Sequence, residues 1–75
     1  MNAITQKFAR VLRRLRTEKN LTQEALAQRS GVDYKYLQKL EGQNPSSPTL
    51  STLEKLANGL GLPLVELIQS LQTQD

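Results

Sequence analysis

The chain contains no cysteine, no histidine and no tryptophan among its 75 residues. Without thiols or imidazoles it cannot form disulfides, and it lacks the usual zinc ligands and the commonest nucleophile and base pairs of catalysis. We therefore expect no metal, no other cofactor and no enzymatic activity. The lack of disulfides fits a reducing compartment, so we expect a cytoplasmic protein.

Long hydrophobic runs are also missing. No segment approaches the roughly 18 consecutive apolar residues that span a bilayer, and residues 1–7 lack the apolar core of a signal peptide, so no membrane association is expected. The length predicts one domain, residues 1–75. Ten Lys and Arg against seven Asp and Glu give a net charge of +3, a mild bias towards polyanions that many proteins without such partners share.

Strand-like alternation is absent, whereas apolar residues recur at helical spacing and predict an all-α fold of five helices. The first is expected at about residues 5–20, with Asn20 able to end it in the left-handed conformation. The next two are short and meet at Gly31, with Thr22 and Asp33 as their N-caps. Residues 42–48 are expected to form a loop, and Pro63 suits the first turn of a fifth helix.

The start of the fourth helix has two candidate caps. Thr49 is one, while Ser51 with Glu54 matches a capping box. Gly61 is the expected end of this helix.

The stretch 23–40 has the features that two short helices need to meet at a tight turn. Ala27 is a small contact residue, Gly31 can take positive φ, and Val32 and Leu37 are apolar residues for a shared core. The spacing of these residues indicates a helix-turn-helix at about residues 22–41.

Residues 21–32, Leu-Thr-Gln-Glu-Ala-Leu-Ala-Gln-Arg-Ser-Gly-Val, resemble the helix-turn-helix of the phage repressor and Cro family, often called the XRE family. The resemblance continues through Glu41, Asn44-Pro45, and the segments 48–50, 53–57 and 60–62. It implies a five-helix lambda-repressor-like domain that acts as a sequence-specific, repressor-like transcriptional regulator of double-stranded DNA.

In this family the third helix enters the major groove. Carried over by position, the base-contacting residues are Tyr34, Lys35, Gln38 and Lys39. Their chemistry is suitable, because lysine donates to guanine, glutamine pairs with adenine, and tyrosine offers a hydroxyl and an apolar ring. The alternative is an ordinary solvated helix face, which also carries such residues.

The resemblance also implies contacts to DNA phosphates. Gln23 matches the family residue that grips a phosphate at a helix N-terminus, and the expected set is Thr22, Gln23, Tyr36, Asn44 and Ser46. For Tyr36, packing in the core is the alternative. The loop after the third helix carries no lysine or arginine, unlike that of many relatives, so fewer phosphate contacts are expected.

Four arginines lie on the first helix, at positions 10, 13, 14 and 16. Such a run is most often a solvated helix face. Arg16, however, falls where the family has an arginine paired with a glutamate at the position of Glu41, so the resemblance implies a structural ion pair between these two residues.

A homodimer is expected, because a domain with few phosphate ligands gains specificity from reading two half-sites. Candidate interface residues on the fifth helix are Val65, Ile68 and Leu71, with closure of the monomer core as the alternative. Other hypotheses remain: a protein-interaction module of the same fold without DNA binding, or the antitoxin or controller of a two-gene system with an unknown partner protein. The resemblance points to a bacterial or phage-encoded, nucleoid-associated protein.

Overall fold

The computed structural model describes residues 3–73, and residues 1, 2, 74 and 75 of the predicted domain lie outside the described part. The described chain consists of five helices without strands, which confirms the predicted all-α class. The helices are α1 (Ala3–Glu18), α2 (Gln23–Ser30), α3 (Tyr34–Leu40), α4 (Leu50–Leu60) and α5 (Leu64–Thr73).

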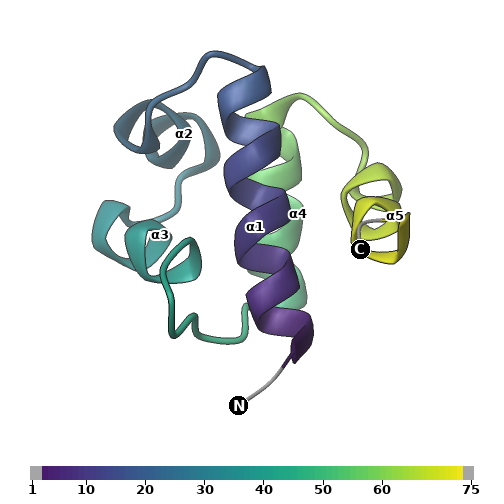
Figure 1. The fold of residues 1–75 in the computed structure, drawn as a ribbon. Coiled ribbons are helices and arrows are strands. Elements are labelled where there is room, and N and C mark those ends of the chain that lie inside the picture. Colours follow the sequence, from purple (N-terminus) through teal and green to yellow (C-terminus); the bar gives the residue numbers. More distant parts are fainter. Residues whose placement is uncertain (1–2, 74–75) are drawn as a thin grey trace.

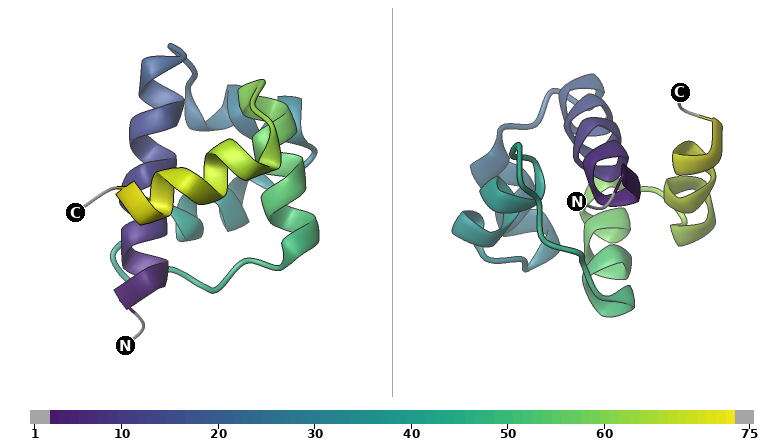
Figure 2. Two further views of the ribbon diagram at one scale, coloured as in Figure 1. Left: turned by 90° about the vertical axis from the view of Figure 1, so that its right-hand side faces the viewer. Right: turned by 60° about the horizontal axis from the view of Figure 1, so that its bottom comes forward.

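The helices surround one apolar core (Figure 1). The short helices α2 and α3 lie on one side of α1 and α4, and α5 lies on the other side. Helix α5 contacts both α1 and α4, across which it runs in the left view of Figure 2. Each helix contributes to the core, whose largest fully buried side chains are Leu12, Leu26, Leu37, Leu40, Leu56, Leu60, Leu67 and Val11.

Helix α1 begins and ends slightly before the predicted range. It ends at Glu18 because Asn20 adopts the left-handed conformation (φ 58°) and reverses the chain. The Leu21 amide then donates to the Arg16 carbonyl at 3.1 Å, which is the long hydrogen bond of a Schellman motif. The left-handed role predicted for Asn20 is thus confirmed, and the turn leads directly into α2.

The predicted N-caps are confirmed. The side chains of Thr22 and Asp33 accept hydrogen bonds from backbone amides in the first turns of α2 and α3. Thr49 caps α4 by accepting from the Thr52 amide at 3.1 Å, so the alternative start at Ser51 is excluded. Gly31 has φ 74°, the left-handed value that lets the chain turn tightly between α2 and α3. These local signals fix the angle at which α3 leaves α2.

At Gly59, α4 packs tightly against α2, and sequence analysis missed this contact. A Cβ atom there would lie 2.8 Å from the Ser30 Cβ and 3.1 Å from both the Ser30 Cα and the Leu26 Cδ1. Arg29 adds a hydrogen bond from its Nε to the Gly59 carbonyl, 2.8 Å long. The helix-turn-helix therefore packs on α4 through a close contact between Gly59 and α2 that leaves no room for a side chain at position 59.

We expect Gly59→Ala to destabilise the fold. Alanine is better by about 1 kcal/mol in a helix interior, but overpacking at this contact costs about 1–3 kcal/mol because the backbone of Ser30 has to move. Urea unfolding of the variant measures the balance, with Asn58→Ala at the neighbouring exposed position as the control. A Gly59→Ala protein more stable than wild type would show that α2 and α4 separate easily.

Candidate nucleic-acid interface

The outward face of α3 carries the four side chains predicted to contact bases. Leu37 and Leu40 are fully buried and anchor the inner face of this seven-residue helix. The outer face exposes the side chains of Tyr34, Lys35, Gln38 and Lys39. A helix anchored along one side and polar along the other has the shape that the major groove admits. The structure thus brings the predicted base-reading set together on one surface.

Two of these side chains are joined. The Gln38 Nε2 donates to the Tyr34 hydroxyl at 3.1 Å, one helical turn away. The second Nε2 proton and the Oε1 of Gln38 remain available, and these are the donor and acceptor that glutamine uses in a bidentate contact with adenine. Tyr34 therefore orients the Gln38 amide.

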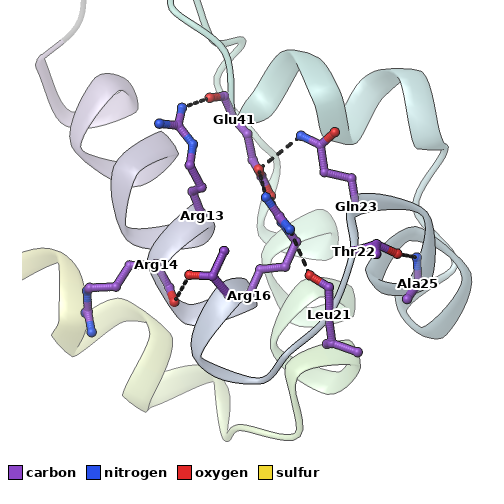
Figure 3. Close-up of polar contacts among 9 residues, drawn as sticks. Arg13, Arg14, Arg16, Leu21, Thr22, Gln23, Ala25 and Glu41 are labelled. Atoms are coloured by element: carbon purple, nitrogen blue, oxygen red, sulfur yellow. Dashed lines mark hydrogen bonds and ion pairs between the residues drawn. The ribbon is translucent and has the colours of Figure 1, made fainter.

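Glu41, directly after α3, is the centre of a polar cluster (Figure 3). Its side chain is 2% exposed, and the Arg16 Nε and Nη2 lie 2.8 and 2.9 Å from its two carboxylate oxygens. Arg16 also donates from Nη1 to the Leu21 carbonyl, and Arg13 donates from Nη2 to the backbone carbonyl of Glu41. The cluster ties α1 to the end of α3 and to the turn before α2.

The candidate phosphate residues at the start of α2 are Thr22 and Gln23. Thr22 is exposed and its hydroxyl is engaged as the N-cap, accepting from the Ala25 amide at 3.0 Å. The Gln23 Nε2 donates to Glu41 at 3.1 Å, leaving one amide proton and the Oε1 available. The first backbone amides of a helix have no partner within the helix and favour anions. This corner of the molecule therefore suits a phosphate group.

The other predicted phosphate residues have less uniform surroundings. Asn44 is exposed and Ser46 is half-buried in the loop between α3 and α4. Tyr36 is half-buried and packs against the core, which was the alternative to a phosphate contact in the sequence analysis. Its contribution to packing is therefore established by the geometry, whereas its contact with a phosphate remains a prediction.

The residues predicted to form a dimer interface differ in exposure. Val65 is 58% exposed, while Ile68 and Leu71 are half-buried. Leu71 packs against the core and lines a small apolar pocket with Ile4 and Phe8. Val65 is thus the apolar residue of α5 that is most available to a second chain.

Sequence analysis missed the role of Arg13 and the bond between Gln23 and Glu41. The arginines of α1 do not form one solvated face, because Arg13 and Arg16 reach Glu41 while Arg14 points away from it and pairs with Glu18 at 3.0 Å (Figure 3). The spacing of Arg13 and Arg16 by one helical turn was the available signal.

The described residues also limit other kinds of site. Within residues 3–73, no three acidic, histidine or cysteine side chains are grouped so as to hold a metal ion. No helix in this part of the chain is long and apolar enough to cross a membrane.

The fold and this surface define a helix-turn-helix protein. The chain belongs to the helix-turn-helix family, whose model matches residues 12–67. It is 49% identical over 55 residues to the HTH-type transcriptional regulator y4dJ of Sinorhizobium fredii, covering 73% of this chain and 70% of that protein. It is 35% identical over 75 residues to the control protein C.MunI of a Mycoplasma species, covering 99% of this chain and 100% of that protein.

A phage protein is also similar. The transcriptional repressor RstR of the cryptic phage CTXphi from Vibrio cholerae is 40% identical over 67 residues, covering 88% of this chain but only 59% of the repressor. The predicted membership of the phage repressor and Cro family is thereby confirmed.

Solved structures of restriction-modification controller proteins have the same fold. C.Esp1396I bound to a 19 base pair DNA duplex matches with a TM-score of 0.87 and 30% identity, covering 96% of this chain and 95% of that one. C.AhdI from Aeromonas hydrophila matches with a TM-score of 0.81 and 39% identity, covering 88% of this chain and 98% of that one.

Proposed function

We propose that this protein is a sequence-specific transcriptional regulator that binds double-stranded DNA and reads the major groove with α3. The observation that carries the proposal is the exposed polar face of α3, held by two fully buried leucines behind a tight glycine turn. The similarity to a controller protein solved on a DNA duplex supports it. A regulator of this kind acts by occupying an operator, and its role is repressor-like.

Phosphate contacts position α3 in the groove. Thr22 and Gln23 suit one such contact at the start of α2, and we assign Asn44, Ser46 and Tyr36 to the backbone as well. Such contacts add affinity without sequence information, whereas the bases are distinguished by the face of α3.

The proposal is tested by selecting binding sites from a pool of random duplexes and then measuring the binding of the selected duplexes by electrophoretic mobility shift. Enrichment of one motif, in two copies about 34 Å or one DNA turn apart, is the expected result. A protein that shifts no duplex, yet is folded by circular dichroism, would instead be a protein-interaction module of this fold.

The regulator binds as a homodimer that contacts its copy through Val65, Ile68 and Leu71 of α5. The exposure of Val65 supports this, because its side chain is 58% exposed on α5 and is therefore available to a second chain. The sparse phosphate ligands of one half-site are a second reason, since linking two recognition helices multiplies their affinities.

We expect Val65→Asp to shift the dimer towards a monomer of 8.4 kDa, because a carboxylate is costly to bury in an apolar contact. Sedimentation at micromolar concentration measures the shift, and Glu66→Asp, which keeps the charge at the neighbouring exposed position, is the control. A wild-type protein that sediments as one chain, unchanged by Val65→Asp, would contradict a dimer in the absence of DNA.

A further inference from the structure

An open pocket of about 340 Å³ lies between α1 and the first residues of the loop after α3. Its walls are Gln6, Ala9, Arg10, Arg13, Gly42 and Gln43. Two arginines, Arg10 and Arg13, thus line one pocket, and no carboxylate is among the lining residues. Like charges that share a pocket are stabilised by an anion between them, and arginine pairs with phosphate oxygens through its planar fork of donors.

The two arginines differ in how they are held. Arg13 donates to the backbone carbonyl of Glu41, which fixes its guanidinium beside the end of α3. Arg10 is exposed and makes no hydrogen bond or ion pair with the described residues 3–73. Arg10 is therefore available to a ligand, and Arg13 is already oriented for one.

The carboxylate of Glu41, whose backbone carbonyl accepts from Arg13, does not cancel this charge. Glu41 is engaged by Arg16 at 2.8 Å and is almost fully buried. Figure 3 shows Arg13 and Gln23 reaching Glu41 from opposite sides. Glu41 therefore lies between the pocket, which Arg13 lines, and Gln23 at the start of α2. The pocket and the candidate phosphate site at Gln23 are thus on two sides of the same end of α3.

We propose that Arg10 and Arg13 bind a backbone phosphate of the DNA whose major groove α3 enters. This inference rests on the proposed function and adds a phosphate site on α1. The site supplies the charge that the loop after α3 lacks, because its residues Gln43, Asn44, Ser46 and Ser47 carry none. A contact of this kind strengthens binding to every sequence equally.

The test compares Arg10→Gln, Arg13→Gln and the double variant with wild type on the selected duplex and on a scrambled one, between 50 and 200 mM salt. The double variant is expected to lower the slope of log K against log salt by about 0.9, the value for one phosphate. It should weaken both duplexes by the same factor and leave the base preferences unchanged. Arg14→Gln removes the same charge from the same helix but from a side chain that points away from the cluster, so its slope should equal that of wild type.

A double variant with the wild-type slope would overturn the phosphate site, as would an equal loss of slope in Arg14→Gln. If Arg13→Gln unfolds, Arg10→Gln still decides, because Arg10 has no partner to lose among residues 3–73. Failure of the proposed function looks different, since wild type itself would then bind neither duplex.

Discussion

Arg16→Ala and Glu41→Ala are each expected to lower the free energy of unfolding by about 3–5 kcal/mol. Either change leaves the other charge without its partner, and the Glu41 side chain is 2% exposed while that of Arg16 is 12% exposed. The whole free energy of unfolding of a native protein is only about 5–15 kcal/mol. The loss is amplified because the same carboxylate accepts from Gln23, so the start of α2 loses its tie to α3.

Thermal and urea unfolding of the two single variants measure this effect. Arg14→Ala is the matched control, because its ion pair with Glu18 is exposed and such pairs contribute about 0.3–0.5 kcal/mol. Replacing Arg16 and Glu41 together by fitted apolar residues should cost far less than either single change. Single variants as stable as wild type would show that the cluster does not hold α1 to α3.

Lys39→Ala is expected to cost about 1–3 kcal/mol of binding free energy on the cognate duplex and to relax the preference at one base pair. Lys39 is exposed on the last turn of α3, beside Gln38 on the face that we assign to base reading. We therefore expect the Lys39 ammonium group to reach the acceptor atoms of a guanine edge.

The measurement is a titration of the variant against the cognate duplex and against single-base variants of it. Lys55→Ala, an exposed lysine of α4, serves as the control for loss of charge alone. If Lys39→Ala weakens cognate and scrambled duplexes by the same factor, Lys39 contacts a phosphate and not a base.

The fold could be predicted because its signals are local. Helical spacing, the caps at Thr22, Asp33 and Thr49, and the glycine at the turn each act within a few residues. These signals were sufficient to predict the number and order of the helices. Some observed helix boundaries differ from the predicted ones by about two residues, as at the start of α1.

The candidate site was predictable only in part, because its supporting contacts join distant parts of the chain. The bond from Arg13 to Glu41 spans 28 positions, that from Gln23 to Glu41 spans 18, and that from Arg29 to Gly59 spans 30. No periodicity in the sequence encodes such pairs. Gly59 lies inside a helix where glycine has no local role, so only the packed structure explains it.

The central claim is that α3 reads DNA sequence, and a competition titration of wild type on the selected duplex and a scrambled duplex at physiological salt tests it most directly. We expect the selected duplex to bind at least about 10³-fold more tightly, and the double variant Lys35→Ala with Gln38→Ala to lose most of this ratio while its affinity for scrambled DNA falls much less than its affinity for the selected duplex. Equal affinity of the wild-type protein for the two duplexes would contradict the claim.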